Sequence, residues 1–410
     1  MKGKIAVLGA GMVGVCCALS LQRRGYAVML IDRKAPGRET SYGNSGVFSR
    51  SSIFPINGPG LWRQLPRDLA NRHPAVRWRA SLLAEPRWLA AFLSQCTPES
   101  VARRASVLDA LIKLSLDLNR QLIADAGLGQ HIRETGWLKV WRNAGTAVAT
   151  AEARALEPFG IRTEVLGPEG IARLEPATGP AFQTGLHILD SASVDDPGAI
   201  VAGYARLFSH DGGSLVAAEV RALLKTTTGW RIETTAAPLD ADFVVVALGP
   251  WSADILRPLG VRMPLFFERG YHLHLAVPPG KGPRRAVYDV DGGYVVSPCA
   301  SGARVTSGVE LSRRDAPANV SQITAAAELA RKTFALGDAI ETAPWLGSRP
   351  TLPDSLPAIG PIPLQHGLYA AFGHQHIGFS TGAATGEIIA AMIAGEAPSI
   401  DAAPFAPSRF

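Results

Sequence analysis

The sequence predicts an α/β fold with a parallel sheet and a second region rich in antiparallel strands. Two apolar runs, 4–8 and 27–31, flank a glycine-rich turn and a helical stretch, which is the pattern of a βαβ unit. A third run, 241–248, is apolar at its end, as a strand covered on both faces should be. From 261 to 309, short runs alternate in hydropathy, which indicates antiparallel strands. We expect 214–220 and 241–248 to return to the first sheet, so that this domain is discontinuous.

The turn after the first strand carries three glycines spaced as G-x-G-x-x-G, namely Gly9, Gly11 and Gly14. Gly9 allows a tight turn, Gly11 leaves room for a pyrophosphate beside the backbone, and Gly14 lets the helix pack close to the sheet. The helix N-terminus offers free N–H groups to the phosphates. Asp32 ends the second strand, where a carboxylate would accept hydrogen bonds from a ribose. This order of elements predicts dinucleotide binding.

The stretch 40–47 follows Asp32 after a polar loop and consists mainly of small and amide residues. Its glycines indicate backbone that runs close to a ligand, so the stretch is a candidate second cradle for the dinucleotide. A fold that binds a nicotinamide cofactor would normally continue with another helix and strand at this point. We therefore favour FAD over NAD.

Composition limits the classes of protein to which the chain can belong. It has 410 residues, of which 47% are hydrophobic, which is enough for a large core and suggests two domains or more. The net charge is +6, but the arginines that carry most of it are scattered, which argues against a nucleic-acid-binding arm. Beyond the first strand and helix, no apolar run approaches the length that spans a bilayer.

The start of the chain resembles a signal peptide, because a charged beginning is followed by an apolar run over 5–21. Three glycines interrupt that run and no cleavage-type sequence ends it, so we expect no export signal. The four cysteines show no C-x-x-C or framework spacing, which predicts a reducing compartment and no structural metal. These features favour a cytoplasmic protein.

Residues 50–130 are expected to be mostly helical, with a long amphipathic helix over 106–126. Trp62, Trp78 and Trp88 lie in this region with arginines between them. Core packing is the default interpretation of these tryptophans. The alternative is a docking face for a membrane surface or an electron acceptor.

The last part of the chain combines rigid and glycine-rich segments. Three prolines fall within 345–360, which predicts an extended, rigid loop. A strand is expected over 367–372 and a glycine-rich loop over 373–382. The helix over 383–394 has small residues at its N-terminus, whose dipole could stabilise developing negative charge.

Together these stretches resemble the FAD-dependent amino-acid dehydrogenase and oxidase family of the glycine and D-amino-acid oxidase type. The resemblance spans essentially the whole chain and is closest to bacterial D-amino-acid dehydrogenases and D-hydroxyproline dehydrogenases. Its motifs are specific for the family, whereas members share them across several amine substrates. The matching pieces are 9–14, Asp32, 41–46, 249–252, 269–271, 347–360 and 373–386.

The resemblance implies a fold of two domains. A discontinuous Rossmann-like FAD-binding domain would comprise residues 1–50, 190–260 and 345–410. A substrate domain with a large, mostly antiparallel sheet and helices would comprise 51–189 and 261–344. The cofactor contacts that this arrangement implies, besides the three glycines and Asp32, are Met12, Val13, Arg33, Ser41, Asn44, Ser45, Gly46, Val220, Ala247, Gly249, Trp251, Gly347, Gly373, His376, Ile377 and Gly378.

The resemblance also implies roles for four side chains near the substrate. Arg349 would clamp the substrate carboxylate, with a structural salt bridge as the alternative, and Tyr271 would be a pocket tyrosine unless it is only packed. His374 and His376 lie where the family approaches the flavin, as hydrogen-bonding scaffold or as base. Members with covalent flavin attach it to a cysteine near the C-terminus, and none follows Cys299, so non-covalent FAD is expected.

The implied reaction is oxidation of the Cα–N bond of an amino acid, most simply a D-amino acid, by hydride transfer to flavin N5. The imino acid would hydrolyse to a 2-oxo acid and ammonia, and the electrons would pass to a quinone-type acceptor. A peripheral contact with the inner face of a membrane is compatible with such an acceptor. The alternatives are a secondary-amine substrate, such as hydroxyproline, proline or sarcosine, and, remotely, an RNA-modifying flavoprotein.

Overall fold

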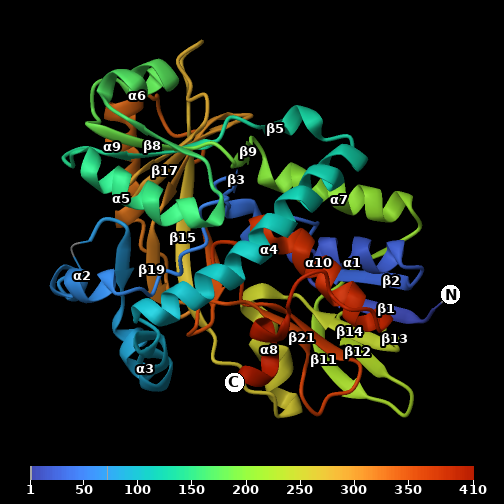
Figure 1. Cartoon of the computed structure of the whole chain (residues 1–410). Helices are drawn as coiled ribbons and strands as arrows, with labels where there is room; N and C mark the ends of the chain where they lie inside the picture. Colours follow the sequence, from blue (N-terminus) through green and yellow to red (C-terminus); the bar gives the residue numbers. More distant parts are fainter. Residues whose placement is uncertain (1, 72) are drawn as a thin grey trace.

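The computed structural model describes residues 2–71 and 73–410, and its N-terminal βαβ unit lies in a six-stranded sheet (Figure 1). Five strands are parallel, and the last is antiparallel to its neighbour. The predicted return of 214–220 and 241–248 to the first sheet is confirmed. The strand order is β10 (Ser214–Ala217), β2 (Ala27–Asp32), β1 (Lys4–Leu8), β14 (Phe243–Val246), β22 (Leu368–Phe372) and β21 (Ala358–Pro361).

Both faces of this sheet are covered, which explains why its central strands are apolar throughout. In β1, Ile5 and Val7 pack toward the helices, whereas Ala6 and Leu8 pack toward a small antiparallel sheet. That sheet contains the buried Trp230 and consists of β11 (Val220–Lys225), β12 (Trp230–Thr234) and β13 (Leu239–Ala241).

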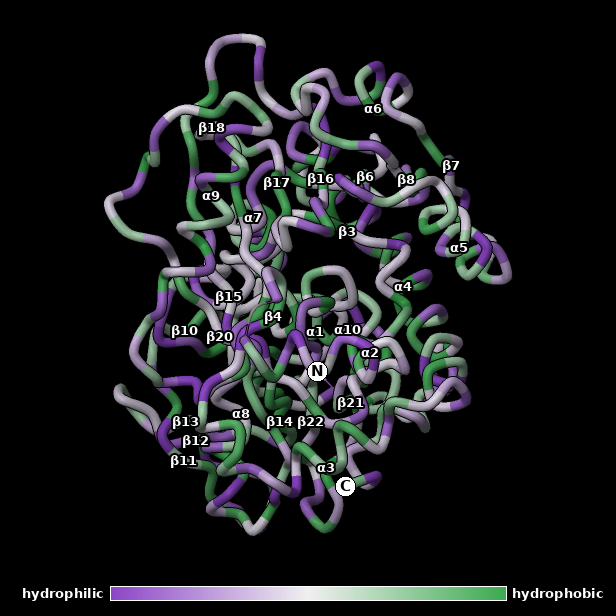
Figure 2. Tube along the Cα trace, turned by 90° about the vertical axis from the view of Figure 1, so that its left-hand side faces the viewer, coloured by the Kyte–Doolittle hydropathy of each residue, from purple (hydrophilic) through white to green (hydrophobic). Residues whose placement is uncertain are grey.

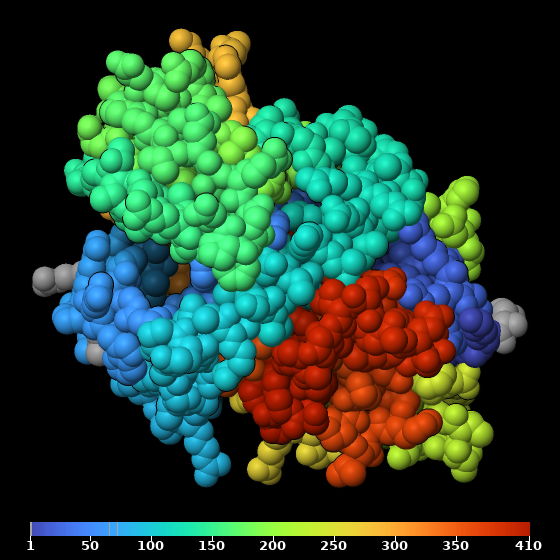
Figure 3. All heavy atoms as spheres, viewed as in Figure 1, coloured from blue at the N-terminus to red at the C-terminus, as the bar shows by residue number. Residues whose placement is uncertain are grey.

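Helices from four distant parts of the chain form the other cover. α1 (Met12–Arg23) approaches α10 (Gly378–Ala394) closely, because a Cβ on Gly386 would lie 2.5 Å from the Cys16 carbonyl oxygen. α4 (Pro98–Asp125) packs on α10, and α7 (Pro197–His210) packs on α1. In the space-filling view the cyan α4 segment lies against the red C-terminal segment (Figure 3).

The second large sheet has ten strands and is mostly antiparallel, as expected. It lies at the opposite end of the molecule from β11–β13 (Figure 2). Its strands are β4 (Val76–Trp78), β19 (Val309–Ser312), β15 (Phe266–Leu275), β18 (Gly302–Ser307), β17 (Tyr294–Cys299), β16 (Ala286–Asp289), β6 (Trp137–Trp141), β8 (Thr184–Ile188) and β7 (Thr163–Leu166), with β20 (Trp345–Thr351) paired to β15.

Helices also pack on this sheet, and a smaller sheet lies beside it. α9 contacts β18 and β15, and α5 and α6 contact β7 and β8. The helices near the sheet are α2 (Gly60–Leu69), α3 (Pro86–Ser94), α5 (Thr146–Leu156), α6 (Pro168–Leu174) and α9 (Ser321–Phe334). The smaller sheet has the order β3 (Val47–Phe48), β9 (Ala192–Val194) and β5 (Ile132–Arg133).

The prediction that 345–360 is an extended loop is wrong. Its first half is β20, which is hydrogen-bonded along β15, and its end is β21. Among the named strands β20 pairs with β15, so Pro350 needs no N–H group for a second neighbouring strand. Because β20 lies in the large sheet, we propose that the domain boundary expected at 345 lies after Thr351. The last helix also begins earlier than expected, at Gly378.

Candidate cofactor and substrate site

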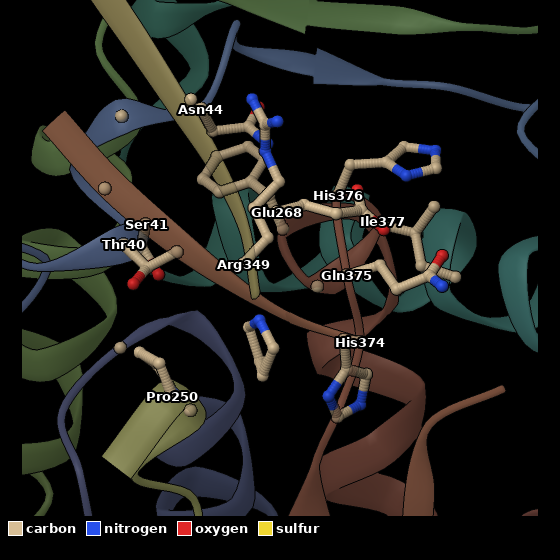
Figure 4. Close-up of a pocket in the computed structure, with 18 of the residues that line it drawn as sticks. Thr40, Ser41, Asn44, Pro250, Glu268, Arg349, His374, Gln375, His376 and Ile377 are labelled. Carbon is tan, nitrogen blue, oxygen red and sulfur yellow. The ribbon is translucent and has the colours of Figure 1, made fainter. Parts of the chain in front are cut away.

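A cavity of about 930 Å³ begins at the carboxyl ends of β1, β2 and β14 and extends to β15 and β20. Carboxyl ends of parallel strands are the usual place for a ligand in an open α/β sheet. Strands of the large sheet and the N-terminus of α10 line the far end, where Figure 4 shows the side chains. The cavity therefore joins the two sheets.

The glycine-rich turn forms a cradle at the first end of the cavity. Gly9 has a φ of +103°, and a Cβ there would lie 2.5 Å from the Ala247 carbonyl oxygen. A Cβ on Gly14 would lie 1.8 Å from the Gly9 carbonyl oxygen, so α1 packs tightly on the turn. A Cβ on Gly11 would meet only the Ser41 hydroxyl, at 3.2 Å. Gly11 thus leaves the backbone open to a ligand.

Two groups beside this cradle suit an adenosine diphosphate. At the start of α1, the Met12 N–H donates to the Ser41 Oγ at 2.9 Å. Asp32 accepts from the Ala10 N–H at 2.7 Å and from the Lys34 N–H at 2.9 Å, and burial raises its pKa. Both its oxygens are thus held in a fixed direction while the residue lines the cavity.

Arg33 and Trp251 close this end of the cavity. The Arg33 guanidinium carbon lies 4.3 Å from the centre of the Trp251 ring, a cation–π contact. Trp251 immediately precedes α8 (Ser252–Leu256), and Gly249, with a φ of +54°, turns the chain out of β14. Val220 lines the same end.

The turn over 40–46 lines the middle of the cavity. Hydrogen bonds within the turn and from Arg304 hold its backbone in place. Asn44 Oδ1 accepts from the Gly46 N–H at 2.8 Å, and Arg304 donates to the carbonyl oxygens of Tyr42 and Asn44. Ser41, Asn44 and Ser45 line the cavity. Gly46 packs instead against the Val194 carbonyl oxygen, behind the lining.

At the far end, Arg349 lies on β20 opposite Glu268 on β15. Its guanidinium covers Gly270, where a Cβ would lie 2.4 Å from Nη2. Among the described residues it forms neither a hydrogen bond nor an ion pair. Burial lowers the pKa of Arg349, and the nearby Glu268 carboxylate opposes that shift. A guanidinium held in this way presents its donor fork to a ligand.

Two histidines stand at the N-terminus of α10 (Figure 4). The His374 Nε2 lies 2.9 Å from the Thr385 Oγ1, and burial lowers its pKa to about 3. Burial, helped by the charge of Arg349, lowers the pKa of His376 to about 4. Both rings are therefore neutral at pH 7.

Gln375, between the two histidines, is a site residue that the sequence reasoning missed. It is buried, and its φ of +49° lies in the left-handed region that favours glycine. Its N–H donates to the Pro350 carbonyl oxygen at 3.0 Å, whereas its Nε2 has no partner among the described residues. The strained backbone and the unpaired buried donor make Gln375 a candidate ligand contact in the cavity.

The expectation that Tyr271 is a pocket tyrosine is wrong. Side chains alternate along β15, so Gly270 and Glu268 face the cavity while Tyr271 points to the opposite face. There its hydroxyl donates to Glu310 and accepts from the Asn319 N–H. Tyr288 lines the cavity instead, with its ring stacked on Trp137.

The remaining predicted site residues largely come together. Only Gly14 and Gly46 among the cofactor candidates lie just outside the lining. Glu268 was missed, although its spacing of two from Gly270 could have indicated the same face of a strand. The predicted residues that line the cavity are Gly9, Gly11, Met12, Val13, Asp32, Arg33, Ser41, Asn44, Ser45, Val220, Ala247, Gly249, Trp251, Gly347, Arg349, Gly373, His374, His376, Ile377 and Gly378.

The described residues contain neither a cluster suited to a metal ion nor a helix suited to span a bilayer. Over residues 2–71 and 73–410, no three His, Cys, Asp or Glu side chains are grouped so that they could hold a metal ion. No helix in these ranges is both long and apolar enough to cross a bilayer. None of the four cysteines is among the residues that line the cavity.

Comparison with known proteins identifies relatives of the whole chain. Residues 4–392 match the model of the family described as FAD dependent oxidoreductase. A D-amino-acid oxidase of Bradyrhizobium diazoefficiens is 32% identical over 99% of this chain and 98% of its own length. A D-amino acid dehydrogenase of Methylobacterium nodulans is 31% identical over 97% of this chain and 96% of its own length.

Solved structures share the fold at lower identity. Glycine oxidase from Geobacillus kaustophilus aligns with a TM-score of 0.77 and 20% identity, covering 100% of this chain and 99% of its own. L-Proline dehydrogenase from P. horikoshii aligns with a TM-score of 0.76 and 18% identity, covering 100% of this chain and 98% of its own.

The residues present fit FAD. A volume of about 930 Å³ is within the range of about 300–1,000 Å³ that small-molecule sites occupy. Gly11 leaves the backbone open at the start of α1, where phosphates bind, and Asp32 stands where a ribose needs an acceptor. At the far end, the N-terminus of α10 supplies partial positive charge beside two neutral histidines.

Proposed function

This chain belongs to the FAD dependent oxidoreductase family, and from that premise we propose that it oxidises the Cα–N bond of a D-amino acid. The observation that carries the proposal is Arg349, a cavity-facing guanidinium without a protein partner among the described residues. Such a fork binds a carboxylate through two parallel hydrogen bonds. The D-configuration is favoured because relatives of about 30% identity over the full length are named D-amino-acid oxidase or dehydrogenase.

Bound FAD would supply the hydride acceptor for the substrate Cα. Arg349 would hold the carboxylate, and the rigid strand pair β15–β20 would fix its direction, so that Cα–H is presented in one orientation. The N-terminus of α10 would stabilise negative charge at the cofactor end. His374 and His376 are neutral at pH 7, and the substrate amine need only be neutral for hydride to leave Cα. The imino acid product would hydrolyse to a 2-oxo acid and ammonia.

We propose a quinone-type acceptor and non-covalent FAD. The cysteines lie away from the cavity, which leaves the flavin without a thiol to which it could be attached. α2 could bring a membrane quinone near, because Leu61 lines the cavity whereas Trp62 and Leu69 are exposed beside Arg63 and Arg67. An exposed face of apolar and basic residues suits the surface of an anionic bilayer.

The test is a panel of D-, L- and N-alkyl amino acids added anaerobically to the purified flavoprotein. We expect D-amino acids to bleach the flavin fastest and an artificial quinone to restore it faster than oxygen does. Preference for N-alkyl or cyclic amines would instead favour the secondary-amine alternative. If no amine bleaches the flavin, the proposed function fails.

A further inference from the structure

We propose that Glu268 recognises the amino group of the substrate, so that Glu268 and Arg349 together bind an α-amino-acid zwitterion. This inference rests on the proposed function, because it requires the cavity to take an amino acid. It goes further by assigning a side chain to the amine and by giving a reason why carboxylic acids that lack an amine bind more weakly.

The first argument is an unsatisfied charge. The Glu268 side chain is fully buried and lines the cavity. Its Oε1 accepts from the Thr351 Oγ1 at 2.8 Å, whereas its Oε2 has no partner among the described residues. A buried carboxylate oxygen without a donor is costly, and proteins usually keep one only where something else binds it. A ligand that brings its own donor would satisfy Oε2.

The second argument is the relation of Glu268 to Arg349. Although their backbones face each other across β15 and β20, the two side chains do not form an ion pair. The Arg349 guanidinium packs over Gly270. The Glu268 carboxylate is instead directed along the strand toward Thr351, with which it forms a hydrogen bond. Both remain in one cavity (Figure 4), where burial raises the pKa of Glu268 and the nearby charge of Arg349 opposes that rise. Two opposite charges held apart in this way match a zwitterion placed between them.

The third argument concerns the alternatives in the pocket. The Gln375 side chain is an uncharged amide, and its oxygen would accept from an ammonium group more weakly than a carboxylate does. His374 is engaged with Thr385. The Glu152 carboxylate also lines the cavity but is paired with Lys139. Glu268 keeps Oε2 without a partner among the described residues, and both an ammonium and a secondary ammonium group can donate to it. A carboxylic acid without an amine would leave Oε2 unsatisfied and would be repelled by its charge.

The experiment compares Glu268→Gln with the wild type. Glutamine keeps the shape and an oxygen for Thr351 but removes the negative charge. We measure KM for the amino acid that bleaches the flavin fastest, and Kd for its deamino analogue (propionate for alanine) from the change in flavin absorbance. We expect KM to rise about ten- to a hundredfold, because the loss of one charge-assisted hydrogen bond weakens binding by about that factor. The Kd of the analogue should stay the same or fall, because the carboxylate is no longer repelled.

Glu310→Gln is the matched control, since Glu310 is a buried carboxylate on the opposite face of the same sheet. It should leave both binding constants unchanged. Equal weakening of amino acid and analogue in Glu268→Gln would show that Glu268 only positions Arg349, and would overturn the inference. So would an unchanged KM.

A second variant covers the case in which Glu268→Gln does not fold. Glu268→Asp keeps the charge and shortens the reach, so KM should rise while the analogue still binds as in the wild type. Failure of the wild type to oxidise any amino acid would instead overturn the proposed function, which keeps the two failures distinct.

Discussion

The guanidinium of Arg349 rests on Gly270, and a Cβ at position 270 would lie 2.4 Å from Nη2 and 2.7 Å from Cζ. Such a separation is impossible, so any other residue at 270 would displace the guanidinium. The φ of Gly270 is not positive, so glycine is needed here for space rather than for backbone freedom. This relation links residues 269–271 of β15 to residues 349–350 of β20.

We predict that Gly270→Ala raises KM for the amino acid while FAD remains bound. The displaced guanidinium would lose at least one charge-assisted hydrogen bond, worth about 1.5–3 kcal/mol, or about ten- to a hundredfold in affinity. Steady-state kinetics and the flavin spectrum measure the two quantities. Gly129→Ala, in open space, is the control. An unchanged KM would mean that Arg349 is not the clamp.

Arg349→Lys tests the clamp directly. Lysine keeps the charge but loses the planar fork, so KM should rise strongly while the spectrum of bound FAD stays normal. Arg349→Ala should be worse, and inhibition by simple carboxylates should disappear with it. Arg269 cannot take over, because it is fully buried beside Glu310 on the opposite face of the sheet. Retained inhibition by carboxylates in Arg349→Ala would contradict the assignment.

Asp32→Ala should release FAD, because the ribose would lose its acceptor and the turn would lose the bond to the Ala10 N–H. The yellow colour retained after gel filtration is the measurement. Asp242→Ala is a matched control, since Asp242 also accepts a backbone N–H, from Lys4 at 2.7 Å, at the opposite end of the same sheet. Full retention of FAD by Asp32→Ala would place the adenosine elsewhere.

The parts of this site that local sequence encodes were predictable. The spacing of the glycines after an apolar strand corresponds to tight contacts at Gly9 and Gly14 and to open backbone at Gly11. Asp32 follows from the end of the next strand. Each of these signals depends on residues within one βαβ unit. The sequence pattern alone was therefore sufficient for the βαβ unit and its glycine-rich turn.

The substrate end depends on pairing between distant strands, which local patterns do not encode. The prolines near Arg349 suggested a loop, whereas β20 is held by hydrogen bonds to β15, about 80 residues earlier in the chain. Tyr271 was assigned to the cavity by family resemblance, but the alternation of β15 directs Glu268 there instead. The strain at Gln375 is a property of the backbone with no signal in residue type.

The last prediction concerns stability in acid and three histidines whose pKa is lowered. Burial lowers the pKa of His272 to about 2, of His374 to about 3 and of His376 to about 4, from an ordinary value of 6.5. The folded protein therefore keeps them neutral, while the unfolded chain binds protons as the pH falls below 6.5. The free energy of unfolding must then decrease between pH 6.5 and about 4, by at most about 1.4 kcal/mol per pH unit for each histidine.

His272→Phe isolates one of these contributions. The His272 ring stacks on Trp345 at 5.0 Å and lies 5.5 Å from the Tyr42 ring, so phenylalanine can replace it without losing the aromatic contacts. We expect a Tm close to that of the wild type at pH 7.5 and a higher Tm at pH 5, because the unfolded variant binds one proton fewer. The slope of unfolding free energy against pH should fall by about 1.4 kcal/mol per pH unit. Parallel profiles of Tm against pH would show that His272 is protonated in the folded state, contrary to its burial.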